Sequence, residues 1–117
     1  MSVSIYHNPR CSKSRQTLEL IEQQKIKPVV IEYLKTPPGK SELKHILKLL
    51  HLSARDLLRK KESEYIELGL DNPDLSDDQI IDIMIKHPKL IERPIVVSDK
   101  GAAIGRPPEK VLEILGD

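Results

Sequence analysis

Hydrophobic residues are spaced differently in successive parts of this chain of 117 residues. Residues 3–6 alternate apolar and polar side chains and lead to an Asn-Pro pair, which predicts a short strand followed by a turn. From Ser14 to about Gln24, apolar residues recur among polar ones, as they do in a helix. Residues 29–34 are an almost continuous apolar run, typical of a buried parallel strand. Strand, helix and strand together predict a βαβ unit, whose crossover should be right-handed.

The middle of the chain predicts helices. After a break at residues 36–39, four apolar residues fall on one helical face: Leu43, Ile46, Leu47 and Leu50. Ser53 with Asp56 resembles a capping box for a short helix. Ser76 with Gln79 is a full capping box, which predicts a helix that ends near residue 87.

The last third returns to strands. Residues 94–98 predict a strand, residues 99–101 a turn, and residues 102–105 a short antiparallel partner. Pro107 and Pro108 are suited to the first turn of a final helix. The element order therefore predicts an α/β protein with a thioredoxin-like fold (βαβ–ββα). A helical insertion at about residues 37–89 separates the second and third strands, and residues 1–117 are expected to form a single domain.

Composition excludes several classes of function. The chain has 19 Lys and Arg against 18 Asp and Glu, so no overall charge attracts nucleic acid or a membrane surface. Trp and Phe are absent, which leaves no stacking platform for single-stranded nucleic acid. No apolar run approaches the ~18 residues of a membrane span, and no signal segment opens the chain. We expect a soluble, cytoplasmic protein that binds neither nucleic acid nor membranes.

Cys11 is the only cysteine, which excludes an internal disulfide and a cysteine-rich zinc site. It lies at the predicted start of the first helix, where unpaired N–H groups and the helix dipole favour a thiolate. Four residues could add positive charge nearby: His7, Arg10, Lys13 and Arg15. A lone cysteine is often just a small buried side chain, but these polar neighbours favour a nucleophile.

Residues 11–14 have the form of a C-x-x-C motif whose second cysteine is replaced by Ser14. Because Ser14 cannot expel a bound thiol, any disulfide or adduct on Cys11 must be resolved by a thiol from outside the chain. The Ser14 hydroxyl can donate a hydrogen bond to the sulfur, cap the helix, or do both.

Three of the six arginines lie at predicted ends of elements: Arg59, Arg93 and Arg106. In a thioredoxin-like topology, the loops before the third strand and after the fourth can approach the cysteine turn, where guanidinium groups would bind a tetrahedral oxyanion. Arg93 and Arg106 each precede a proline, which keeps the arginine extended, and Pro94 is a candidate cis-proline. The alternative is three unrelated surface arginines. Two arginines within predicted helices are interpreted as facing solvent: Arg15 and Arg55.

Residues 5–15, Ile-Tyr-His-Asn-Pro-Arg-Cys-Ser-Lys-Ser-Arg, resemble the active-site segment of the glutaredoxin-dependent arsenate reductases, the ArsC family. Four further stretches agree with that family in order and spacing: residues 33–38, 57–60, 92–97 and 104–108. The resemblance covers essentially the whole chain. Ser12-Lys13 in place of Gly-Thr, and the lack of a longer C-terminal tail, resemble the short chromosomal branch of the family.

The resemblance implies a role for each candidate residue. Cys11 would attack arsenate, His7 would help to form its thiolate, and Ser14 would support that state. Three arginines would hold the oxyanion: Arg59, Arg93 and Arg106. Glutathione, as co-substrate, would then attack arsenic, and a glutaredoxin would reduce the adduct before water releases arsenite. No bound cofactor and no metal is implied.

Two other functions remain open from the sequence. A monothiol, glutaredoxin-like thiol–disulfide oxidoreductase would keep Cys11 and use no arsenate. A regulatory binding protein of the same superfamily would keep the fold and need no thiolate. One branch of that superfamily binds RNA polymerase, and it typically has a cysteine where Ser14 stands here.

Overall fold

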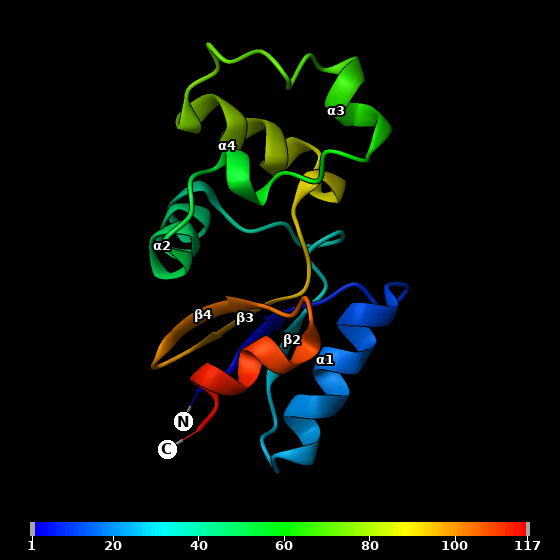
Figure 1. The fold of residues 1–117 in the computed structure, drawn as a ribbon, viewed down its shortest axis with the longest axis vertical. Coiled ribbons are helices and arrows are strands. Elements are labelled where there is room, and N and C mark those ends of the chain that lie inside the picture. Colours follow the sequence, from blue (N-terminus) through cyan, green and yellow to red (C-terminus); the bar gives the residue numbers. More distant parts are fainter. Residues whose placement is uncertain (1, 117) are drawn as a thin grey trace. The chain divides into compact units, whose positions relative to one another are not determined.

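The computed structural model describes residues 2–116, which fall into two units. The described residues of Met1–Thr36 and Arg93–Asp117 make up the first, here called the sheet unit. Pro37–Glu92 make up the second, the helical unit (Figure 1). We expected a helical insertion at about residues 37–89. The organisation of the whole chain as a single domain stays a prediction.

The sheet unit contains all four strands assigned in the described residues: β1 (Ser4–Tyr6), β2 (Val29–Ile31), β3 (Ile95–Ser98) and β4 (Gly101–Ile104). Their order is β2-β1-β3-β4, with β1 parallel to β2 and antiparallel to β3, and β3 antiparallel to β4. This is the predicted βαβ–ββα pattern of a thioredoxin-like fold. Tyr6 pairs with both Ile31 and Ile95, and Ile95 pairs with Ile104. One edge of the sheet therefore receives the ends of β1, β2 and β4 and the start of β3.

The second strand differs from its prediction. We expected a buried strand over residues 29–34, but β2 has three residues and lies at the outer side of the sheet, where Val29 and Val30 are 58% and 45% exposed. The chain turns directly after it, and the Lys35 N–H donates to the Glu32 carbonyl at 2.9 Å. Valine and isoleucine favour strands whether or not a second face is covered, so an apolar run alone did not distinguish an outer strand from a central one.

Two helical segments cover one face of this sheet: α1 (Ser12–Gln23) and the 3₁₀ helix η3 (Pro108–Ile114) (Figure 1). Their apolar residues and those of the strands form the core of the unit: Val3, Ile5, Ile21, Val96, Val111, Ile114 and Leu115. The predicted final helix is thus present, in the tighter 3₁₀ form. This packing holds α1 against one face of the sheet.

The helical unit contains α2 (Lys40–Leu50), η1 (Arg55–Leu57), α3 (Ser63–Glu67), α4 (Asp77–Lys86) and η2 (Pro88–Leu90). Both predicted capping boxes are confirmed. Ser76 Oγ accepts from the Gln79 N–H at 3.2 Å, and Gln79 Oε1 accepts from the Ser76 N–H at 2.8 Å. Ser53 and Asp56 make the same reciprocal pair of hydrogen bonds at 3.3 and 3.1 Å; Ser53 lies one residue before Ala54, the N-cap residue of the short 3₁₀ helix η1.

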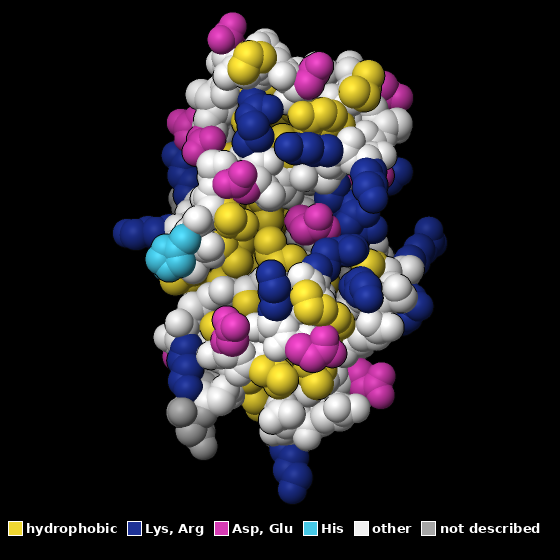
Figure 2. All heavy atoms as spheres, in the orientation of Figure 1, with side chains coloured by type: hydrophobic (Ala, Val, Ile, Leu, Met, Phe, Trp, Pro, Cys, Tyr) yellow, Lys and Arg dark blue, Asp and Glu magenta, His cyan; other side chains and the backbone are white. Residues whose placement is uncertain are grey.

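Acidic and basic side chains are interspersed over the face of the molecule drawn in Figure 2. Within residues 2–116, no helix has the length and apolar character that crossing a membrane would require.

Candidate active site

Cys11 occupies the N-cap position of α1, in the turn that follows β1. Two hydrogen bonds of 3.0 Å shape this turn: Asn8 Oδ1 accepts from the Arg10 N–H, and the Asn8 carbonyl accepts from the Cys11 N–H. The Arg15 N–H then donates to the Cys11 carbonyl at 3.0 Å and starts the helix. Asparagine before proline is a common turn former, so the Asn-Pro pair places the partly exposed thiol at the first turn of the helix.

Ser14 joins the end of β1 to the first turn of α1. Its hydroxyl accepts from the Asn8 N–H at 3.0 Å and lies 2.6 Å from Nδ1 of His7. The His7 N–H in turn donates to the Ile31 carbonyl at 2.8 Å. The hydroxyl is thus used to fix the loop, and the group of Ser14 that stabilises the sulfur is its backbone N–H. Of the two roles that the sequence left open for the hydroxyl, neither matches this arrangement.

His7 does not supply the positive charge that its position in the sequence indicated. It is buried, with 6% of its surface exposed. Burial lowers the pKa of His7 from its ordinary 6.5; Glu32 opposes this change and Arg15 adds to it. The imidazole is therefore mainly neutral at pH 7, and its direct partner is Ser14. Its implied role in forming the thiolate stays a prediction.

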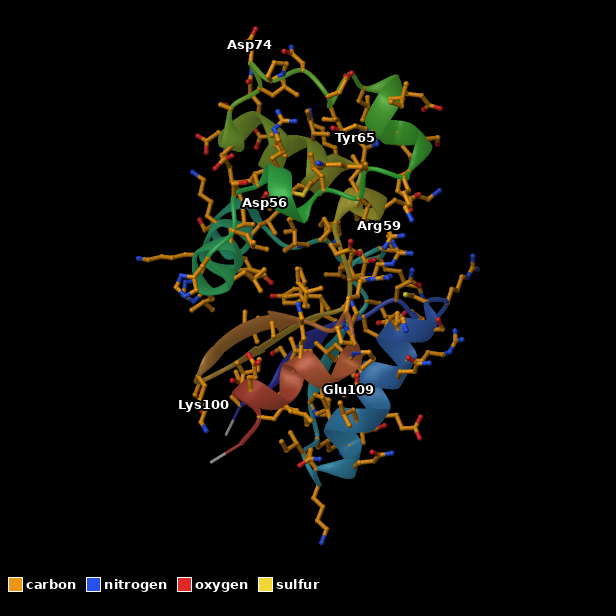
Figure 3. The ribbon with its side chains drawn as sticks, viewed as in Figure 1. Asp56, Arg59, Tyr65, Asp74, Lys100 and Glu109 are labelled. Carbon is orange, nitrogen blue, oxygen red and sulfur yellow. The ribbon has the colours of Figure 1, made fainter. Side chains whose placement is uncertain are left out.

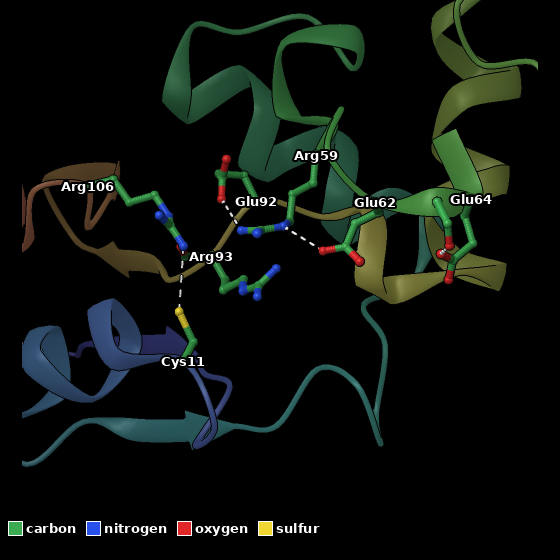
Figure 4. Close-up of polar contacts among 8 residues, drawn as sticks. Cys11, Arg59, Glu62, Glu64, Glu92, Arg93 and Arg106 are labelled. Carbon is green, nitrogen blue, oxygen red and sulfur yellow. Dashed lines mark hydrogen bonds and ion pairs between the residues drawn. The ribbon is translucent and has the colours of Figure 1, made fainter. Parts of the chain in front are cut away.

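Two of the three candidate arginines flank Cys11 within the sheet unit. Arg106 follows β4, and its Nη2 lies 3.6 Å from Cys11 Sγ (Figure 4). Its Nε donates to the Arg93 carbonyl at 2.8 Å, which ties the loop after β4 to the residue before β3. The Arg93–Pro94 and Arg106–Pro107 peptide bonds are both cis, so the structure has a cis-proline at the position that the sequence indicated.

The surroundings of Cys11 favour a thiolate. Burial alone would raise the pKa of Cys11, yet the pKa lies below its ordinary value of 9.0. The Ser14 N–H, the guanidinium of Arg93 and the Lys13 N–H outweigh burial, because each stabilises negative charge on sulfur. Arg93 lowers the pKa of Cys11 through a side-chain hydrogen bond and through its charge, and Arg106 Nη2 also lies 3.6 Å from the sulfur.

Two residues that sequence reasoning missed hold this arrangement together. Thr17 is 0% exposed, and its hydroxyl donates to the Lys13 carbonyl at 2.8 Å and approaches the Gly105 carbonyl at 3.5 Å. The Gly105 N–H donates to the Pro94 carbonyl at 2.9 Å. A Cβ on Gly105 would collide with Thr17 and would lie 2.8 Å from Pro94 Cγ. Glycine therefore lets the loop that carries Arg106 approach α1.

A weak signal for both residues exists in the sequence. Thr17 shares one helical face with Ser14 and Ile21, and all three are buried. A polar residue in the middle of a buried helical face needs a partner. Gly105 directly precedes Arg106, which is where a close approach of the backbone would position the arginine.

Arg59, the third candidate arginine, belongs to the helical unit and follows η1 (Figure 3). Its Nε lies 3.2 Å from Glu62 Oε2 and its Nη1 lies 2.8 Å from Glu92 Oε1 (Figure 4). The side chain is only 18% exposed, so these two carboxylates offset much of its charge. Neither carboxylate was recognised from the sequence as a partner of Arg59, although Glu92 immediately precedes Arg93.

Of the two arginines expected to face solvent, Arg15 is exposed and Arg55 is partly buried, and both also bind backbone carbonyls. Arg15 Nη1 donates to the Pro9 carbonyl at 2.9 Å, beside the Cys11 turn. Arg55 donates to the carbonyls of Leu70 and Asn72, each at 2.8 Å. A guanidinium has five donors on a long side chain, so an arginine on a helix surface can still fix a neighbouring loop.

This arrangement suits covalent attack on an anion. The thiolate is the nucleophile of cysteine chemistry, and guanidinium groups beside it stabilise the negative charge of a bound oxyanion and of its transition state. Among residues 2–116 there is no cluster of three or more His, Cys, Asp or Glu side chains that could hold a metal ion.

The fold and the site define a thioredoxin-like protein with its one thiol at the start of a helix. Residues 6–114 match the family model described as the ArsC family, and the chain belongs to that family. It is 50% identical over 116 residues to an arsenate reductase of Escherichia coli, a match that covers 99% of this chain and 82% of that protein. It is 53% identical over 115 residues, 97% of each chain, to YfgD, an uncharacterized protein of Escherichia coli strain K12. The solved structure of an arsenate reductase from Vibrio cholerae has a TM-score of 0.94 and 56% identity, and covers 97% of this chain and 98% of that one.

Proposed function

We propose that this protein is an arsenate reductase that uses Cys11 as its single nucleophile and takes its electrons from glutathione and a glutaredoxin. The observation that carries the proposal is the thiol with a lowered pKa, in contact with Arg106 and close enough to Arg93 to be stabilised by it. Membership of the ArsC family, and relatives at about half identity that are named arsenate reductases, support the choice of arsenate among tetrahedral oxyanions.

The first half of the reaction builds an adduct on arsenic. Arg93 and Arg106 hold arsenate beside Cys11, with Arg59 as the third arginine that the resemblance implies. The Cys11 thiolate forms a bond to arsenic, and one arsenate oxygen leaves as water. The glutathione thiol then bonds to arsenic, and a second oxygen leaves as water, which gives a Cys11–arsenic–glutathione adduct.

The second half transfers two electrons. The glutaredoxin thiol attacks the glutathione sulfur, the arsenic–sulfur bond breaks, and its electron pair stays on arsenic. Arsenic is thereby reduced from the +5 to the +3 state, and glutathione and glutaredoxin are joined in a mixed disulfide. Water then releases arsenite and restores the Cys11 thiol. In sum, arsenate and two thiols give arsenite, one disulfide and one water.

His7 and Ser14 act on the position of Cys11 in this proposal. The neutral imidazole and the Ser14 hydroxyl fix the loop at 2.6 Å from each other, and the hydroxyl also binds the Asn8 N–H. That leaves the Ser14 backbone N–H directed at the sulfur. We therefore attribute the stabilisation of the Cys11 thiolate to its backbone and arginine contacts. We attribute the geometry of those contacts to His7 and Ser14.

Arsenite production tests the function. The wild type should form arsenite from arsenate when glutathione and glutaredoxin are both present, with a large fall when either is omitted, and Cys11→Ser should form none. Full turnover with thioredoxin in place of both would contradict the proposed electron source.

A monothiol oxidoreductase is the second candidate, because a thiol of lowered pKa would also serve thiol exchange. It would be identified by glutathione exchange on Cys11 at the same rate with and without arsenate, and by the absence of arsenite. Tight binding to a protein partner that persists in Cys11→Ala would instead identify a regulatory binding protein.

A further inference from the structure

A cavity of about 230 Å³ lies beside the loop that leads to Cys11. Its lining comes from two short stretches of the sheet unit: His7, Asn8, Pro9 and Arg10, and Glu32, Leu34 and Lys35. The first stretch follows β1 and the second follows β2, and these strands are parallel neighbours, so both loops leave the same edge of the sheet. The hydrogen bond from the His7 N–H to the Ile31 carbonyl, 2.8 Å long, joins them at their base.

The order of the strands gives this cavity a definite place relative to the arginines. β1 lies between β2 on one side and β3 and β4 on the other. Arg93 and Arg106 belong to the loops at β3 and β4, whereas the cavity belongs to the loops of β1 and β2. Cys11 directly follows the first of the two stretches that line the cavity, and the loops of Arg93 and Arg106 lie on the other side of β1.

The walls of the cavity carry both signs of charge around an apolar centre. Arg10 and Lys35 are exposed cations, and the Glu32 carboxylate lies 3.5 Å from the ammonium of Lys35. Pro9 and Leu34 supply apolar surface, and Leu34 is unusually exposed for a leucine. A small ligand that fits these walls has carboxylates for the two cations, an ammonium for Glu32 and an aliphatic chain between them.

We propose that this cavity binds glutathione and directs its thiol to the arsenic on Cys11. Glutathione is a tripeptide with two carboxylates, one ammonium and a thiol, which matches the charges of the walls. The inference rests on the proposed function for the need of an external thiol. It goes further in assigning the binding of glutathione to Arg10, Glu32 and Lys35, which have no other role in the proposed reaction.

Binding can be measured without the reaction, with S-methylglutathione, whose sulfur is blocked. Titrated into the ¹⁵N-labelled full-length protein, it should shift the amide signals of residues 7, 8, 10, 32, 34 and 35. Arg10→Glu and Lys35→Glu should each weaken its binding about tenfold or more, because each loses a charge-assisted hydrogen bond and places a carboxylate opposite a carboxylate. Lys27→Glu is the matched control, since Lys27 precedes β2 and so lies at the other end of that strand.

The outcomes separate this inference from the proposed function. Weakening in Arg10→Glu and Lys35→Glu, with wild-type affinity in Lys27→Glu, supports the cavity. Equal weakening in all three variants, or shifts confined to other residues, overturns it. Inorganic phosphate that produces the same shifts at similar affinity shows only a general anion site and overturns it as well. Arsenite production by the wild type, assayed separately, reports on the proposed function whichever result is obtained.

Discussion

Arg106 Nη2 lies 3.6 Å from the sulfur of Cys11, although the two residues are 95 positions apart in the sequence. The loop after β4 and the start of α1 meet because both lie at the sheet edge where β1 and β4 end. Thr17 and Gly105 pack at this junction, so the distance between thiol and guanidinium depends on the close contact of these two small residues.

The first prediction concerns the acidity of the thiol. The rate of alkylation of Cys11 should rise with pH through a midpoint below 9.0, because backbone N–H groups and Arg93 stabilise the thiolate. Arg93→Met should move that midpoint upward. Arg10→Met is the matched control, since Arg10 is adjacent to Cys11 in the chain but is not among the groups that lower its pKa. A midpoint unchanged in Arg93→Met would remove Arg93 from the thiolate site.

The second prediction concerns Gly105. Gly105→Ala should lower the free energy of unfolding by about 1–3 kcal/mol, as overpacking of a filled site usually does. It should also reduce kcat/KM for arsenate, because the loop that bears Arg106 must move away from Thr17 and Pro94. Chemical denaturation and steady-state kinetics measure the two effects. Gly116→Ala is the control, because a Cβ on Gly116 would meet open space. Equal effects of the two substitutions would contradict the role given to the close packing of Gly105 against Thr17 and Pro94.

The sequence allowed the fold to be predicted because its signals are local. Alternating apolar residues, two capping boxes and the prolines are each determined by a few neighbouring positions, and the element order then leaves few topologies. The burial of β2 was not predictable in the same way. Whether a strand is outer or central depends on which strands pair with it, and the residues of the strand itself do not indicate those partners.

The candidate site shows the same division. Cys11 and its helix start could be recognised because the Asn-Pro turn and the polar residues lie within a few positions of the thiol. The neutral state of His7 could not be recognised from the sequence, since it results from burial of the side chain in the folded protein. The pairing of Arg59 with Glu92 joins residues 33 positions apart, and only the folded chain brings them together.

The third prediction concerns the pH dependence of stability. The pKa of His7 is lower in the folded protein than its ordinary 6.5, so the unfolded chain binds the proton more readily. The free energy of unfolding should therefore fall as pH decreases below about 6.5. Urea denaturation between about pH 5 and 8 measures this slope, which His7→Gln should reduce. His45→Gln, on an exposed position of α2, controls for the substitution itself, and an identical slope in wild type and His7→Gln would contradict the assignment.

The fourth prediction ranks the arginines. Replacement by lysine keeps the charge but loses the two-pronged geometry, so Arg93→Lys and Arg106→Lys should each raise KM for arsenate about tenfold or more. Arg59→Lys should raise it less, because Glu62 and Glu92 already offset the charge of Arg59. Steady-state kinetics over arsenate concentration gives the order. A larger effect for Arg59 than for Arg106 would contradict this account of the three side chains.

The measurement that tests the central claim most directly is the intact mass of the protein after exposure to arsenate and glutathione without glutaredoxin. The wild type should carry arsenic and one glutathione together, because the adduct on Cys11 forms but cannot be reduced further. Cys11→Ser should carry neither. Glutathione bound to the wild type without arsenic, at the same level whether or not arsenate is supplied, would contradict the account and identify simple thiol exchange as the chemistry of Cys11.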